Sequence, residues 1–215
     1  MKNAQNNTLN VNEPGSAKLL MQHSKVMIAY TEKSDSHVWE SFKRGEEKAF
    51  NYIYREHVRQ LYNYGMQVCK EDEWVRDSLQ MMFVDLRKRR SRLGEVKSIK
   101  GYLFTVFHRT LFKLIKSKRK GMGTFVSLNK EDNSFFIEAS HETKLIAEEF
   151  SYERKNDIEA ALNKLSQRER QAIILLYREE LSYKEIAEIM DFKEVKTART
   201  LVYRAMNKLK GIFNV

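Results

Sequence analysis

Two helix-forming stretches carry side chains that can contact nucleic acid, and the clearer of them is the last, over residues 195–212. Lysine and arginine donate to phosphates and guanine, and asparagine pairs with adenine. Here such groups share the helix face opposite an apolar stripe, as expected of a surface that reads duplex DNA. The candidate DNA-contacting residues are Lys193, Lys196, Thr197, Arg199, Thr200, Tyr203, Arg204 and Asn207. The alternative interpretation is an ordinary helical module with a polar outer face.

The other stretch, over residues 98–118, is strongly basic and interleaves cations with aromatic rings. Exposed rings beside cations suit a single-stranded or melted nucleic acid, because bases stack on the rings while the backbone meets the charges. The outward side is expected to present Thr105, His108, Arg109, Phe112, Lys113 and Lys116. In an alternative interpretation, the ring of Phe112 simply packs against another helix.

A third candidate surface lies on the helix predicted over residues 73–90. Its second side mixes apolar and polar side chains, namely Asp77, Gln80, Met81 and Val84. Apolar residues among polar ones on an outer face are typical of a protein-binding surface. A helix sandwiched between two others produces the same pattern, so both interpretations stay open from composition alone.

Catalytic and metal sites find no support in the residue pattern. The 5 histidines are scattered, without the i, i+4 pairing of a zinc-binding helix, and Cys69 is the single cysteine. No glycine-rich loop precedes a lysine to cradle a phosphate. We therefore expect no enzyme activity, no metal, no cofactor and no small-molecule substrate.

The charge balance favours a polyanionic partner and locates the surface that meets it. The 215 residues include 39 Lys and Arg against 29 Asp and Glu, which gives a net charge of +10 and a pI near 9.5. Residues 84–120 hold 13 basic and 2 acidic side chains, whereas residues 161–215 hold 11 and 7, and residues 127–160 hold 4 and 9. A run of like charge is often only a solvated face. An apolar stripe nevertheless predicts that this basic stretch is folded: Ile99, Leu103, Val106, Thr110 and Leu114.

Residues that favour turns are scarce, since the chain has 1 proline and 8 glycines, and this favours an all-α fold. We expect two helical domains joined by a flexible linker. The expected segments are a flexible N-terminal extension over 1–38, a helical domain over 39–118, an acidic linker over 119–156 and a C-terminal domain over 157–215. No apolar run has the length of a membrane span, and the single cysteine suits a reducing compartment, so we expect a cytoplasmic protein.

Helix starts are best defined in the C-terminal domain. Ser166 with Glu169, and Ser182 with Glu185, have the spacing of capping boxes. They predict helices over 166–179 and 182–190, followed after the connection 191–194 by the helix over 195–212. The last two helices then form a helix-turn-helix, whose second helix enters a DNA major groove.

Two stretches of the sequence resemble the extracytoplasmic-function (ECF) class of bacterial RNA polymerase sigma factors, and together they span more than half of the chain. Residues 49–120, with DSLQMMFVDL at 77–86 and GYLFTVFHR at 101–109, are similar to sigma region 2. Residues 165–210, with LSYKEIAEIM at 181–190 and YRAMNKLK at 203–210, are similar to region 4. Two positions depart from the family pattern, because Thr110 replaces a common asparagine after Arg109 and Asp191 replaces the usual glycine of the helix-turn-helix connection.

The resemblance implies a division of labour between the three surfaces. The outer side of the helix over 73–90, with Asp77, Gln80, Met81 and Val84, would grip the clamp helices of the largest subunit of RNA polymerase. The basic helix and the loop before it would meet and help melt the −10 promoter element. That loop and its flanks add Arg89, Arg90, Lys97 and Lys100 to the −10 candidates. The last helix would read the −35 element as duplex.

The resemblance also implies the partners. These are the RNA polymerase core, promoter DNA and, as for many members of the family, an anti-sigma factor that is often a membrane protein. The leading hypothesis is an ECF-type sigma factor that directs promoter-specific initiation of transcription. The alternatives are a free-standing helix-turn-helix transcriptional regulator and a helical protein-interaction adaptor.

Overall fold

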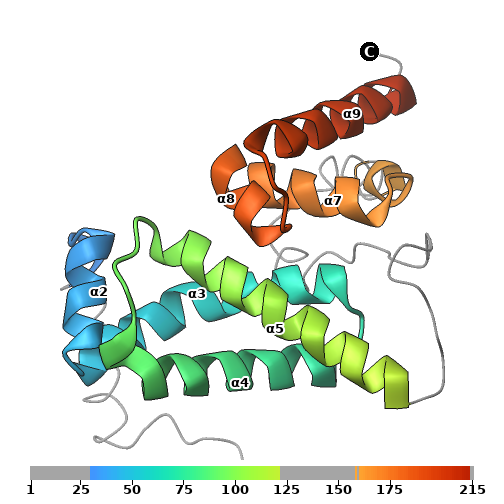
Figure 1. The fold of residues 1–215 in the computed structure, drawn as a ribbon. Helices are drawn as coiled ribbons and strands as arrows, with labels where there is room; N and C mark the ends of the chain where they lie inside the picture. Colours follow the sequence, from blue (N-terminus) through green and yellow to red (C-terminus); the bar gives the residue numbers. More distant parts are fainter. Residues whose placement is uncertain (1–29, 122–157, 159, 214–215) are drawn as a thin grey trace, which may run out of the picture.

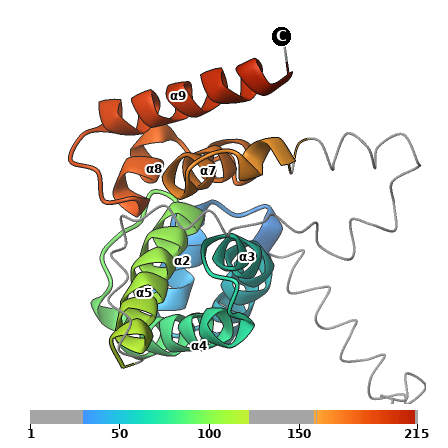
Figure 2. The ribbon, with the colours of Figure 1, turned by 90° about the vertical axis from the view of Figure 1, so that its right-hand side faces the viewer.

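The computed structural model describes residues 30–121, 158 and 160–213, and within these residues the chain forms helices and no strands, as predicted. The N-terminal helices are α2 (Asp35–Lys43), α3 (Glu47–Val68), α4 (Asp72–Arg89), the short 3-10 turn η1 (Arg90–Arg92) and α5 (Ile99–Gly121). The C-terminal helices are α7 (Gln167–Ile173), its π-helical continuation η3 (Ile174–Arg178), α8 (Tyr183–Ile189) and α9 (Val195–Phe213). Figures 1 and 2 show the C-terminal group lying against α3 and α5, with α4 on the far side.

The folded part of the chain begins before the predicted boundary at residue 38. The Trp39 indole is 1% exposed and donates from Nε1 to the carbonyl oxygen of Gly94 at 2.8 Å. The Asp35 carboxylate accepts from the backbone nitrogen of Ile99 at 2.7 Å. Helix α2 thus holds the connection between α4 and α5, and the prediction of a flexible extension is wrong for residues 30–38. The 9 residues of α2 are too few for periodicity to reveal such a helix.

Other boundaries agree with the prediction only in part. Gly45, with φ +92, separates α2 from α3, because this left-handed backbone conformation suits glycine. Helix α5 continues to Gly121. The remaining residues of the predicted extension, 1–29, and most of the predicted linker, 122–156, lie outside the described residues.

Both predicted capping boxes are present in the C-terminal domain. The backbone nitrogen of Ser182 donates to the Glu185 carboxylate at 2.8 Å, and the backbone nitrogen of Glu185 donates back to the Ser182 hydroxyl at 3.3 Å. Ser166 and Glu169 make the same reciprocal arrangement at the start of α7. These caps satisfy the amide groups that every helix start leaves without a partner, and they fix where α7 and α8 begin.

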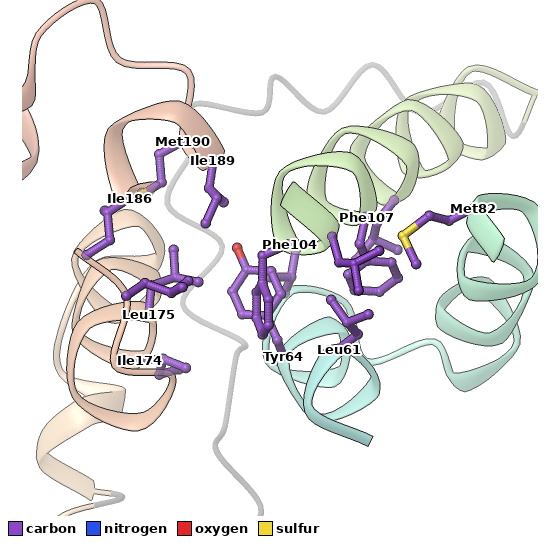
Figure 3. Packing of buried hydrophobic residues seen from close by; sticks show 14 of the residues in the cluster. Leu61, Tyr64, Met82, Phe104, Phe107, Ile174, Leu175, Ile186, Ile189 and Met190 are labelled. Carbon is purple, nitrogen blue, oxygen red and sulfur yellow. The ribbon is translucent and has the colours of Figure 1, made fainter. Parts of the chain in front are cut away.

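Apolar side chains of the two domains join in one continuous core. Tyr64 on α3 and Phe104 on α5 face Leu175 and Ile189 of the C-terminal domain (Figure 3). Helix α5 is therefore buried on two sides. The single stripe predicted for it is correspondingly wrong in part, because three of its positions, Val106, Thr110 and Leu114, are only half-buried. The fully buried positions are Ile99, Leu103, Phe104, Phe107 and Leu111.

Gly65 marks the closest packing inside the N-terminal domain, and its replacement tests that packing. A Cβ atom at this position would lie 2.8 Å from Phe107 Cζ and 2.8 Å from Val75 Cγ1. We expect Gly65→Ala to lower the free energy of unfolding by roughly 1–3 kcal/mol, as overpacking does in cores. Gly211 on α9 has nothing within 4 Å of such a Cβ, so the control Gly211→Ala should raise stability slightly. Urea unfolding of both variants measures this, and equal midpoints would contradict it.

Candidate nucleic-acid and protein-binding surfaces

The polar face of α9 is fully available at the surface. All eight predicted residues are exposed: Lys193, Lys196, Thr197, Arg199, Thr200, Tyr203, Arg204 and Asn207. A shallow groove of about 510 Å³ runs along this face between Lys196, Thr200 and Arg204. Arg168 of α7 also lines it, a residue that the sequence analysis did not select. Its guanidinium lies 5.1 Å from the centre of the Phe192 ring, a tertiary contact without a signal in the local sequence.

Helix α9 is held in this position by small side chains and one ion pair. Ala198 and Ala205 are both 0% exposed, so α9 can approach α7 and α8 closely. Lys208 Nζ lies 2.8 Å from the Glu169 carboxylate. Burial opposes ionisation of Glu169, but the hydrogen bonds from Lys208 and Ser166 outweigh it and lower the pKa of that carboxyl. The capping residue of α7 therefore also fixes α9.

The predicted residues of the basic stretch divide into two groups. Arg89, Lys97, Arg109, Lys113 and Lys116 are exposed. The exposed Arg89 is paired with Asp85 at 2.7 Å, and the half-buried Arg90 donates to the Arg87 carbonyl oxygen at 3.0 Å.

The second group comprises Lys100, Thr105, His108 and Phe112, which are half-buried. The last three of these were predicted to face outward. His108 and Phe112 border the C-terminal domain, and Lys100 pairs with it. The hydroxyl of Thr105 instead donates to the Gly101 carbonyl oxygen at 2.8 Å. The prediction placed this side of α5 in solvent because a helix pattern cannot show that a second domain covers it.

His108 is part of the packing of α5. Its Nδ1 lies 2.8 Å from the Tyr64 hydroxyl, and its ring centre lies 4.2 Å from that of Phe112. Burial, followed by the charges of Arg109 and Arg168, lowers the pKa of His108 to about 4. The imidazole is therefore neutral at neutral pH, and its Nδ1 shares a hydrogen bond with the Tyr64 hydroxyl. Phe112 is likewise half-buried and packs against the apolar core.

The outer side of α4 remains open. Met81 is 55% exposed and Val84 is 45% exposed, and Gln80 is also exposed, while Asp77 is half-buried. A groove of about 760 Å³ between α3 and α4 is lined by Gln80, Val84 and the ring of Tyr54, which is 43% exposed. Tyr54 was not predicted as a surface residue, because on α3 it lies within a series of apolar positions that is typical of a core. Helix α4 is thus not sandwiched between two others.

Metal clusters and membrane-spanning helices were also sought in the described part of the chain. Among residues 30–121, 158 and 160–213, no three His, Cys, Asp or Glu side chains gather in a way that would hold a metal ion. Over the same residues, none of the helices combines the length and the hydropathy that crossing a membrane requires.

Known proteins resemble this chain in sequence and in structure. Residues 155–209 match the model of sigma-70 region 4. The chain is 22% identical over 162 residues to the ECF RNA polymerase sigma factor SigM of Bacillus subtilis (strain 168), covering 75% of this chain and 93% of that protein. Sequence similarity thus relates this chain to an ECF sigma factor over most of its length.

Two solved structures have the same fold as this chain. One is the sigma factor RpoE in complex with the anti-sigma factor NepR from Bartonella quintana, with a TM-score of 0.57, 20% identity and coverage of 78% of this chain and 98% of that one. The other is CnrH in complex with the cytosolic domain of CnrY, with a TM-score of 0.56, 16% identity and coverage of 85% and 98%. The similarity extends over both helical domains.

The first turn of α5 meets two acidic residues of the C-terminal domain. Lys100 Nζ lies 3.2 Å from the carboxylate of Glu179, whose side chain is 4% exposed. Gly101 leaves room for Glu185, since a Cβ atom at position 101 would collide with that side chain. Burial opposes ionisation of Glu185, yet hydrogen bonds from Ser182 and Ser98 lower its pKa. A charged contact therefore aligns the two domains beside their shared core.

The contact between Lys100 and Glu179 can be tested by exchanging the charges. Lys100→Glu places a second carboxylate beside the buried Glu179, and like charges at this distance repel strongly away from water. We expect the domains of this variant to separate, which small-angle X-ray scattering would detect as a larger radius of gyration. Adding Glu179→Lys should restore the compact form. An unchanged radius in the single variant would contradict the role of this ion pair.

His108 predicts a specific dependence of stability on pH. The unfolded chain protonates the imidazole below its ordinary pKa of 6.5, whereas the folded chain does so only below about 4. The stability that depends on the neutral ring is therefore complete above pH 6.5 and is lost as the pH falls from 6.5 to 4, by at most about 3 kcal/mol. His108→Gln keeps an acceptor for Tyr64 without titrating. The free energy of unfolding of this variant should fall less between pH 7.5 and 5 than that of the parent protein. Parallel curves of unfolding free energy against pH would argue against the role of His108.

Proposed function

We propose that this chain is an ECF sigma factor, which binds the RNA polymerase core and directs it to promoters through −10 and −35 recognition. The supporting observation is that two surfaces of different chemistry are exposed at the same time. The outer face of α4 is partly apolar, and the polar face of α9 is cationic. They lie at opposite ends of the molecule in both views (Figures 1 and 2), so one protein can engage a protein partner and duplex DNA together. This function would depend on binding energy alone and would need no catalytic group of this chain.

The α4 surface is proposed as the site for the clamp helices of the largest polymerase subunit. Met81 and Val84 supply exposed apolar area, and Gln80 supplies hydrogen bonds at its edge. The adjoining groove adds Tyr54, an aromatic side chain of the kind that dominates binding energy at interfaces. Asp77 is half-buried at the start of this surface.

The DNA-contacting roles are proposed for two helices. Lys196, Thr197 and Thr200 stand near the start of α9, where residues of a recognition helix reach base edges, and Arg204 lies one turn further along. Arg109, Lys113 and Lys116 form the exposed basic side of α5 that would hold the −10 strand. Lys100, His108 and Phe112 become available to DNA only if the domains separate.

Inhibition by an anti-sigma factor is a further part of the proposal. Both structural relatives were solved with such a partner or with a cytosolic domain bound to them, NepR for RpoE and CnrY for CnrH. A partner of this kind would act where the polymerase acts, in the cytoplasm. We infer that it would compete for the exposed α4 surface.

The deciding experiment mixes the purified chain with core polymerase and a library of promoter fragments. A sigma factor should co-elute with core and give transcripts that start at defined sites. A free-standing regulator would bind duplex DNA without polymerase and leave the start sites of core unchanged. The second outcome would rule out the proposed function.

Replacing the apolar centre of the α4 surface should weaken binding to core. Met81→Asp or Val84→Asp introduces a charge that must lose its water in the complex, and we expect at least a tenfold rise in Kd, about 1.4 kcal/mol or more. Tyr177, 59% exposed on η3, provides the control Tyr177→Ser, which should bind core normally. Fluorescence anisotropy with labelled chain measures both, and equal affinities would refute the assignment.

Neutralising the α9 groove should weaken duplex binding and its dependence on salt. The double variant Lys196→Gln with Arg204→Gln removes up to two cations that neutralise phosphates, so the slope of log K against log salt should fall by about one unit for each of them. Lys210→Gln removes an exposed cation from the same helix outside the proposed set. The slope of log K against log salt for Lys210→Gln should match that of the parent protein. A similar decrease in both variants would indicate general electrostatic attraction only.

A further inference from the structure

A cavity of about 500 Å³ lies between the two domains. One wall comes from α5 through His108, Arg109 and Phe112, and the other comes from α7 and the end of α8. Its volume is that of a site for a small organic molecule. Because each domain supplies one wall, the cavity exists only while the domains are packed together.

Gln171 gives the clearest sign that this cavity is built for a ligand. Its side chain is 4% exposed and lines the cavity, and its Nε2 has no hydrogen-bond partner among the described residues. Buried amide groups almost always have a partner, so an unpaired one beside an open volume needs explanation. An acceptor atom of a bound molecule would satisfy it.

The charges around the cavity favour an anion. Arg109 and Arg168 line it from opposite domains, and neither makes an ion pair with a described acidic residue. Arginine has the donor geometry for phosphate. Asp191 is the single acidic residue in the lining, so the ionised groups sum to one positive charge. Its carboxylate can accept a hydrogen bond from an N–H group of the same ligand.

Rings and apolar side chains complete the lining. The rings of His108 and Phe112 contact each other in a tilted arrangement with centres 4.2 Å apart, and Ile189 and Met190 lie on the other wall. A flat ring with polar edges fits between such surfaces, because its faces contact apolar atoms while its edge meets Gln171 and Asp191.

We propose that this interdomain cavity binds a small nucleotide, with its phosphate at Arg109 and Arg168 and its base near Gln171 and Asp191. Binding of a ligand that contacts both walls favours the packed arrangement by mass action. If the proposed function holds, the ligand also withholds Arg109 from promoter DNA, so that its concentration regulates the sigma factor. The binding itself depends on neither polymerase nor promoter.

The test titrates ATP, GTP and inorganic pyrophosphate separately into the full chain by isothermal calorimetry, without polymerase or DNA. We expect at least one nucleotide to saturate one site per chain and to bind at least tenfold more tightly than pyrophosphate. Absence of saturable nucleotide binding, or equal affinity for pyrophosphate, would overturn the proposal. A negative result in this titration does not change the result expected in the assay with core polymerase, so the two proposals are tested independently.

Variants of the residues that line the cavity then test where the nucleotide binds. Gln171→Leu removes the amide while preserving volume, and Arg168→Gln removes one cation at the surface; each should weaken nucleotide binding at least tenfold. Lys118→Gln, an exposed cation on α5 outside the cavity, should leave it unchanged. Lys100→Glu, which separates the walls, should also weaken binding. Parent-like affinity in Arg168→Gln, whose surface position does not endanger folding, would overturn the assignment even if Gln171→Leu were unstable.

Discussion

The double burial of α5 is the constraint on which the rest of the structure depends. One side of the helix packs through Phe107 and Leu111 on α3 and α4, and another side meets α8 beside Phe104. Apolar contact alone would allow the domains to slide. The pair between Lys100 and the buried carboxylate of Glu179 opposes this sliding, because separation would leave the carboxylate with only the more distant Arg178, at 3.8 Å, as an ion-pair partner. This ion pair fixes the relative position of the two domains more than it adds to net stability.

The surfaces differ in whether the two domains must separate before a partner can reach them. The outer face of α4 and the polar face of α9 are open as the molecule stands. The side of α5 that includes Lys100 and His108 is held against the C-terminal domain. A protein that docks on α4 therefore needs no rearrangement, whereas a nucleic acid that uses all of the basic stretch must first separate the domains.

Features with a local cause could be predicted from the sequence, and features with a distant cause could not. The capping boxes at Ser166 and Ser182 involve residues three apart, so their pattern was sufficient to place α7 and α8. The exposed face of α9 followed from one apolar stripe for the same reason. The half-buried position of His108 depends on Tyr64, which lies 44 residues earlier, and on a second domain. No periodicity within α5 carries that information.

Asp191 stands where glycine is usual in the family pattern, and the structure explains this departure. Its φ of 55 lies in the left-handed region, which explains why glycine is usual there and why an aspartate, one of the few other residues that tolerate it, is present. The backbone nitrogen of Phe192 still donates to the Ala187 carbonyl oxygen at 2.8 Å, so the turn closes in the ordinary way. What changes is the interdomain cavity, where the aspartate adds a carboxylate that glycine would lack. The substitution therefore alters the chemistry between the domains while preserving the helix-turn-helix.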